Sequence, residues 1–129
     1  MPGPLSGIRV LDLCTFINGP AATCQLAENG ADVIKIEPAS GDPMRHSGGG
    51  PGVLFCGFEV FNRMKKSLTI DLKADGAFTV MKRLVQWADV LAENFRPGVM
   101  ERLGLSYETV KTWNPRIIYA SNSGFGPRG

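Results

Sequence analysis

The sequence has 129 residues, of which 43% are hydrophobic and 20% charged, a balance typical of one globular domain rather than an intrinsically disordered chain. Its 14 Lys and Arg residues against 12 Asp and Glu give a formal net charge of +2, which is too small to favour a nucleic acid as partner. Three cysteines without a CxxC pair, no signal-peptide pattern and no apolar run of about 18 residues lead us to expect a soluble, cytoplasmic protein without a membrane partner.

The first third of the chain predicts a βαβ unit. Residues 8–13 form a short apolar run that is typical of a buried strand. Residues 21–28 favour a helix, with Pro20 suited to its first turn and Gly30 suited to its end. Residues 31–37 favour a second strand, and because a helix crosses over between the two strands, we expect them to be parallel.

The middle of the chain combines a long loop with further regular elements. Residues 38–53 are rich in glycine and proline and too long for a simple connection, so we expect a functional or mobile loop. Residues 54–64 carry phenylalanines at a spacing that suits a short helix, and residues 67–72 favour a third strand. Residues 73–87 repeat apolar side chains at helical spacing, which predicts an amphipathic helix.

The last third continues the alternation of strands and helices. Residues 89–94 favour a fourth strand, residues 99–103 and 106–113 favour two short helices, and residues 116–121 favour a fifth strand before a final loop at 124–129. This alternation predicts an α/β fold with an open, mostly parallel, Rossmann-like sheet and helices on both faces, in one domain spanning residues 1–129.

In open parallel sheets, ligands bind beyond the carboxyl ends of the strands, where loops and helix N-termini meet. The loops expected at that edge are residues 14–19, 38–53, 71–73 and 94–98. None of them carries the GxGxxG pattern of dinucleotide enzymes or a GxxxxGK[ST] phosphate loop, which disfavours both classes.

Few residues suggest catalysis. His46 is the only histidine, and a single loop histidine is more often a solvated group than a general acid or base. Cys14 follows the first strand beside a helix N-terminus, which can lower a thiol pKa, although burial as a small apolar residue is the more common role. Cys24 and Cys56 are expected in the core. One histidine and three scattered cysteines do not form a zinc site, which usually needs four closely spaced ligands.

Several cations are expected near the ligand-binding edge. They are Arg96, Arg102 and those of the run at residues 62–66. Such charges usually form solvated surfaces, but beside loop N–H groups they would suit a phosphorylated ligand.

Short motifs over nearly the whole chain occur in an order and spacing that resembles the CaiB/BaiF family of class III coenzyme A transferases. This family includes formyl-coenzyme A transferase, carnitine coenzyme A transferase and α-methylacyl-coenzyme A racemase. The matching segments are residues 5–13, 19–21, 30–37, 41–43, 62, 65–68, 71–73 and 93–98, together with Arg45. Each motif alone is weak, whereas their combination is specific.

The resemblance implies coenzyme A or an acyl-coenzyme A as ligand and substrate, with no metal. The positions assigned to coenzyme binding are Thr15, Phe16, Ile17, Arg45, Leu72, Lys73, Asn94, Phe95, Arg96 and Arg102.

By the same resemblance, residues 15–17 approach the coenzyme through their backbone, residues 72–73 lie near the adenine, residues 94–95 form a pocket wall and Arg102 suits a phosphate. Core packing for the apolar residues and solvation for the cations remain the alternatives. The chain has Pro38 where the family often has an arginine, so one phosphate contact is either absent or supplied by Arg45.

The family's transferases use an aspartate that attacks the thioester carbonyl, and its racemases use a histidine and an aspartate for proton transfer. We expect these groups, and the family's second domain, to lie beyond residue 129, so that this chain has no catalytic residue. The resemblance also implies a homo-oligomer. A fragment of an acyl-coenzyme A racemase and a non-catalytic assembly domain remain the alternative functions.

Overall fold

The computed structural model describes residues 3–47 and 56–126. The elements in chain order are β1 (Arg9–Asp12), α1 (Asn18–Glu28), β2 (Asp32–Glu37), the 3-10 turn η1 (Pro43–His46), α2 (Cys56–Asn62), β3 (Lys66–Thr69), α3 (Ala77–Trp87), β4 (Val90–Glu93), α4 (Val99–Arg102), α5 (Tyr107–Trp113) and β5 (Ile118–Ser121).

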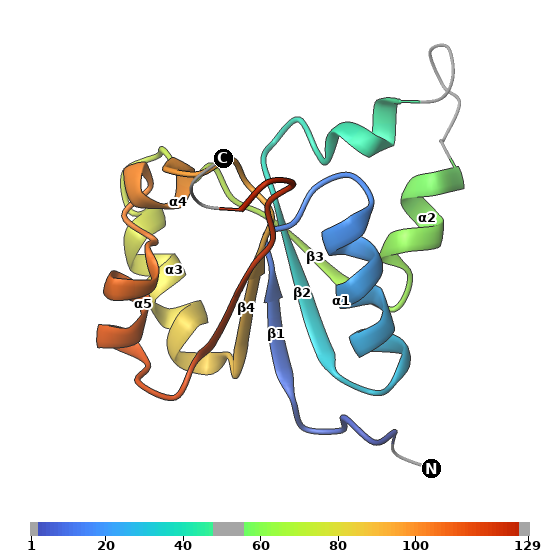
Figure 1. Ribbon diagram of the computed structural model, residues 1–129, viewed down its shortest axis with the longest axis horizontal. Coiled ribbons are helices and arrows are strands. Elements are labelled where there is room, and N and C mark those ends of the chain that lie inside the picture. Colours follow the sequence, from blue (N-terminus) through green and yellow to red (C-terminus); the bar gives the residue numbers. More distant parts are fainter. Residues whose placement is uncertain (1–2, 48–55, 127–129) are drawn as a thin grey trace.

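The strands form one five-stranded sheet in the order β3-β2-β1-β4-β5, and every neighbouring pair is parallel. Figure 1 shows α1 and α2 on one face of this sheet and α3, α4 and α5 on the other. The predicted open parallel α/β fold is therefore confirmed. The order follows the doubly wound pattern, in which the chain leaves β1 toward β2 on one side and later returns to place β4 on the other.

Side chains of each central strand alternate between two apolar clusters. Leu11 and Leu13 of β1 and its continuation belong to the larger cluster, with Met81 and Val85 of α3. Val10 belongs to the smaller cluster, with residues of α1 and β2. Because successive strand residues point to opposite faces, Asp12 lies on the same side as Val10, which is the α1 side of the sheet.

Several bounds differ from the sequence prediction: α1 begins at Asn18 rather than at residue 21, and β5 begins at Ile118 rather than at residue 116. At the third strand and α3, turns explain the difference. The third strand ends at Thr69 rather than at residue 72, and α3 begins at Ala77 rather than at residue 73. Between them the Asp71 carboxylate accepts a hydrogen bond from the backbone N–H of Lys73, and Gly76 has a φ of +87° at the start of α3. This left-handed conformation favours glycine and separates strand from helix.

The long loop after β2 contains a structured first half. Asp42 accepts the backbone N–H of Met44 and so caps η1, which was not predicted. The rest of the predicted loop, residues 48–53, and the first two residues of the predicted helix at 54–64 lie outside the described residues. Among the helices of the described segments, none has the length and apolar character that crossing a membrane requires.

Candidate functional site

The described parts of the loops that follow the strands meet at one edge of the sheet, and three of the hollows between them concern the candidate site. The first, of about 410 Å³, lies beyond β1, β2 and β3, and its walls include Thr15, Leu72, Lys73 and Phe95. Apolar side chains from the strand ends, among them Ile36, form its floor. A mostly apolar pocket with a few polar groups at its rim is the usual form of a small-molecule site.

The other two hollows lie on the β4 and β5 side of the same edge. One of about 640 Å³ is lined by Glu93, Arg96 and Tyr119, and one of about 350 Å³ is lined by Asn18 and Asn94. Phe95 lines all three hollows. The half-buried Phe95 is therefore a wall that these hollows share.

Six of the ten positions assigned from the sequence line these hollows. They are Thr15, Leu72, Lys73, Asn94, Phe95 and Arg96. Phe16 and Ile17 are exposed on the loop that also carries Thr15, and Arg102 is exposed at the last position of α4. The structure thus brings most of the assigned residues to one edge, as the parallel fold requires.

Arg45 does not line any of these three hollows and instead binds the carboxylate of Glu37. Its Nε and Nη2 atoms each donate a hydrogen bond of 2.8 Å to the carboxylate of Glu37, and its guanidinium lies 3.6 Å from the centre of the Phe58 ring. A bidentate pair of this kind engages the fork of the guanidinium. Arg45 therefore stabilises the loop after β2 in this structure.

The carboxylate of Glu37, the last residue of β2, accepts hydrogen bonds from three different residues. Besides Arg45, it accepts hydrogen bonds from the backbone N–H of Asp42 at 3.0 Å and from the Ser67 hydroxyl at 2.8 Å. Burial alone would raise the pKa of Glu37, but the hydrogen bonds from Arg45, Asp42 and Ser67 outweigh it and lower the pKa to about 2. Glu37 is therefore a permanent anion that ties β2, β3 and η1 together.

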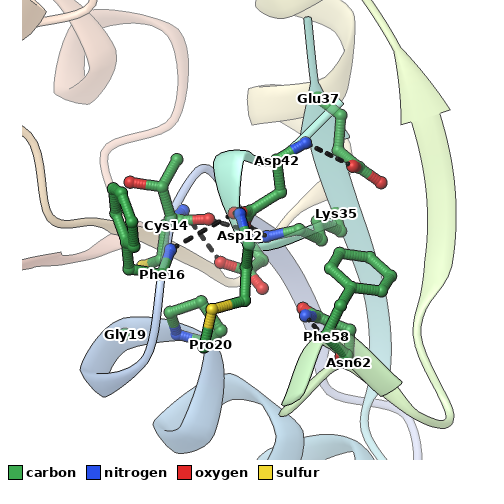
Figure 2. A network of polar contacts seen from close by, with 12 residues as sticks. Asp12, Cys14, Phe16, Gly19, Pro20, Lys35, Glu37, Asp42, Phe58 and Asn62 are labelled. Atoms are coloured by element: carbon green, nitrogen blue, oxygen red, sulfur yellow. Dashed lines mark hydrogen bonds and ion pairs between the residues drawn. The ribbon is translucent and has the colours of Figure 1, made fainter. Parts of the chain in front are cut away.

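The backbone of the loop after β1 is fixed from three sides. Lys35 Nζ donates to the Cys14 carbonyl oxygen at 2.7 Å, and Asp42 Oδ1 accepts from the Phe16 N–H at 3.4 Å. Asn94 makes two bonds to Thr15, accepting from its N–H at 2.8 Å and donating to its carbonyl at 2.9 Å. Figure 2 shows Lys35 and Asp42 converging on the Cys14 to Phe16 segment from the side of β2.

Phe16 adopts a backbone conformation that is uncommon for residues other than glycine, with a φ of +63°. Its side chain is 52% exposed, and that of Ile17 is 51% exposed. Strained residues of this kind persist only when their surroundings hold them, and they cluster at functional sites. The loop therefore exposes two apolar side chains to solvent, while hydrogen bonds from neighbouring residues fix the conformation of its backbone.

Asn94→Ala is expected to lower the free energy of unfolding by about 1–3 kcal/mol, because both polar groups of the Thr15 backbone lose their partner. Asn29→Ala is the matched control. It removes an exposed hydrogen bond from the Asn29 side-chain amide to the Gln25 carbonyl at the end of α1, and it should lower the free energy of unfolding by less than about 0.5 kcal/mol. Urea denaturation of the two variants measures the difference. Equal losses would show that Asn94 does not fix the loop.

Two buried ion pairs lie between the sheet and the helices on the α1 side. Lys35 Nζ is 2.8 Å from Asp42 Oδ2, a close ion pair whose angle is too poor for a hydrogen bond. Lys65 Nζ is 2.8 Å from Asp12 Oδ2 and also donates to the Pro20 carbonyl. All four side chains are at most 2% exposed. Burial lowers the pKa of Lys65, and the carboxylate of Asp12 opposes that effect.

The cations of the run at residues 62–66 do not lie at the ligand-binding edge, so that prediction is wrong. Lys65 points into the interior toward Asp12, and Lys66 pairs with Asp32 at the amino ends of β3 and β2. Arg63 pairs with Glu28 at the end of α1. Lys65 is thus paired in the interior, whereas Arg63 and Lys66 are paired away from the carboxyl ends of the strands.

The candidate catalytic side chains have structural roles or are exposed. Cys14 is buried, and burial together with the neighbouring Asp12 raises the pKa of its thiol, so it is a small apolar residue as favoured above. Cys24 is buried as predicted, whereas Cys56 is exposed, so its assignment to the core is wrong. His46 is exposed and its Nε2 lies 3.1 Å from the Ser40 carbonyl oxygen.

Sequence reasoning missed the buried polar network of Asp12, Lys35, Glu37 and Asp42. A signal was present, because Asp12, Lys35 and Glu37 each interrupt an otherwise apolar strand. Strands covered on both faces are usually continuous apolar runs, so a charge within one indicates a partner. Within residues 3–47 and 56–126, three or more potential metal ligands do not gather at any point.

The fold defines an open parallel α/β protein with hollows at the carboxyl ends of its strands. Residues 5–129 match the model of CoA-transferase family III, and the chain therefore belongs to that family. It is 48% identical over 128 residues to the acetyl-CoA:oxalate CoA-transferase of Acetobacter aceti, covering 98% of this chain and 33% of that protein. It is 41% identical to the succinate–glutarate CoA-transferase of Agrobacterium fabrum, covering 98% and 34% of the two chains.

Solved structures agree with this assignment. The crystal structure of Rv3272 from M. tuberculosis superposes with a TM-score of 0.91 at 42% identity, covering 99% of this chain and 36% of that one. A CaiB/BaiF family protein from Brucella suis superposes with a TM-score of 0.87 at 37% identity, covering 94% and 33%. The chain spans about a third of the length of the relatives that it matches.

Proposed function

We propose that this chain forms the coenzyme A-binding unit of an enzyme that transfers coenzyme A between an acyl-coenzyme A and a carboxylic acid. The observation that carries this proposal is the meeting of three hollows at Phe95, on the edge where six assigned positions come together. The names of the relatives support the reaction, since those compared above transfer coenzyme A between carboxylic acids.

The first hollow suits the adenine end of the coenzyme. Its apolar floor and the half-buried Leu72 match a flat ring, and Lys73 is exposed at its rim, where a phosphate would meet it. Arg96 lies in the adjacent hollow, and Arg102 follows on α4. Because Arg45 is engaged with Glu37, we assign the phosphate contacts to Lys73, Arg96 and Arg102.

The chain's own residues bind and orient the ligand in this proposal. The backbone of residues 15–17 is held for close approach to the coenzyme by Asn94 and Asp42. We assign no nucleophile among the described residues, because burial raises the pKa of the Cys14 thiol and His46 is exposed beside the Ser40 carbonyl. The homo-oligomer also remains a proposal.

Isothermal titration of the 129-residue chain with coenzyme A tests the proposal. We expect Lys73→Ala to weaken coenzyme A binding about tenfold, because a charged hydrogen bond to phosphate is lost. Lys82→Ala is the matched control, since Lys82 is an exposed cation on α3 outside all three hollows, and it should leave the affinity unchanged. No heat of binding at millimolar coenzyme A would count against the proposed function.

A further inference from the structure

The two buried ion pairs on the α1 side of the sheet are alike in burial and distance but differ in what they touch. Lys65 and Asp12 contact the Pro20 carbonyl, Asn62 and the Thr23 hydroxyl, all of which belong to α1 and α2. Their pair therefore packs helices against the sheet. Asp12 reaches the site loop only through one oxygen, Oδ1, which accepts the Cys14 N–H at 2.9 Å.

Lys35 and Asp42 instead contact the loop after β1 directly. Lys35 Nζ lies between the Cys14 carbonyl oxygen at 2.7 Å and Asp42 Oδ2 at 2.8 Å. The other oxygen of Asp42 accepts the N–H groups of Phe16 at 3.4 Å and Met44 at 2.8 Å. One ion pair thus connects the loop after β1 with the turn η1 after β2, and these two loops border the first hollow.

We propose that Lys35 and Asp42 are positioning residues that preset the backbone of residues 14–16 for coenzyme A. This inference rests on the proposed function. Neither side chain can touch a ligand, because Lys35 is 2% exposed and Asp42 is fully buried. They act through the Cys14 carbonyl and the Phe16 N–H, and they stabilise Phe16 at a φ of +63° before any ligand arrives.

Two physical reasons make this pair effective. Hydrogen bonds and ion pairs are stronger in the low dielectric of the interior, where water does not compete for Lys35 or Asp42. A loop that is already ordered loses little conformational freedom on binding, so more of the contact energy appears as affinity. A pair buried beneath the loop fixes the loop without occupying the space that the ligand needs.

The test compares two double variants that each replace a buried ion pair by neutral side chains of similar shape. The test variant is Lys35→Met/Asp42→Asn, and the control is Lys65→Met/Asp12→Asn. Each Asn keeps an oxygen that can accept the backbone N–H groups now bound by Asp42 or Asp12. Replacing both partners avoids an unpaired buried charge, which would unfold the protein for reasons unrelated to the loop.

Amide hydrogen exchange of Thr15 and Phe16 is measured in the ligand-free protein, and coenzyme A affinity by titration, under conditions where circular dichroism shows each variant folded. In the test variant we expect exchange at these amides to be about tenfold faster and binding about tenfold weaker. In the control variant both quantities should stay within about threefold of the wild type.

Unchanged exchange in the test variant, or equal losses in both variants, would overturn the positioning role. If the wild type does not bind coenzyme A, the proposed function fails, and the exchange rates still decide whether Lys35 and Asp42 hold the loop. If the test variant does not fold, wild-type exchange decides, because a preset loop protects the Phe16 amide without ligand. Protection that appears only with coenzyme A would contradict the inference.

Discussion

Gly19→Ala is expected to destabilise the protein by about 3 kcal/mol, because the interior has no room for a methyl group at this position. A Cβ atom on Gly19 would lie 2.5 Å from both Cβ and Sγ of Cys14 and 3.3 Å from Cγ of Asn94. Cys14 is buried beneath the loop and α1, so it cannot move aside without displacing them. The free energy of unfolding from urea denaturation gives the size of the effect.

Gly124→Ala is the control for this prediction. Nothing lies within 4 Å of the position that its Cβ would take, and its backbone is not in the left-handed region. We expect its free energy of unfolding to stay within about 0.5 kcal/mol of the wild type. If Gly19→Ala were equally mild, the close packing of α1 against the site loop would be incorrect.

Glu37→Gln is expected to lower the free energy of unfolding at neutral pH by about 2 kcal/mol, with a defined pH dependence. The pKa of Glu37 falls from 4.5 to about 2 on folding, which corresponds to about 3 kcal/mol at most. Arg45 is 31% exposed, so solvent screens its share and we expect the smaller value.

The sign of this pH dependence follows from the lowered pKa. The unfolded chain binds a proton at Glu37 below pH 4.5, whereas the folded chain does so only below about pH 2. The stabilisation is therefore fully present above pH 4.5 and is lost as the pH falls toward 2, so wild type and variant should converge over that range. Denaturation curves at a series of pH values measure this convergence.

Glu108→Gln provides the comparison for a surface carboxylate. Glu108 is also ion-paired, with Lys111, but its side chain is 74% exposed. Exposed pairs contribute little, so we expect the free energy of unfolding of this variant at neutral pH to stay within about 0.5 kcal/mol of the wild type. An equal loss in both variants would show that the hydrogen bonds to Glu37 do not stabilise the fold.

The order and type of the elements could be predicted from the sequence because the strands are short apolar runs separated by turn residues. The prediction erred at several boundaries, and at one of them a polar side chain decides where the strand ends. Asp71 looks like part of a strand in sequence, yet its carboxylate closes a turn with Lys73, and α3 starts only after Gly76. Such side-chain bonds to the backbone compete with regular structure and leave little trace in periodicity.

The edge where the candidate residues gather could be predicted, because parallel strands bring their carboxyl ends together. The partners of individual charges could not be predicted. Arg45 and Lys65 were placed near the ligand by position, but Glu37 and Asp12 engage them across the fold. Those partners are 8 and 53 residues away in sequence, and only the packed structure makes them neighbours.

Phe16 and Ile17 extend from a loop whose shape is determined by Asn94, Asp42 and Lys35 rather than by their own side chains. A library that varies only position 17 would therefore change the apolar group exposed at this edge while the frame that carries it stays constant. Position 16 is more restricted, because its φ of +63° strains β-branched side chains.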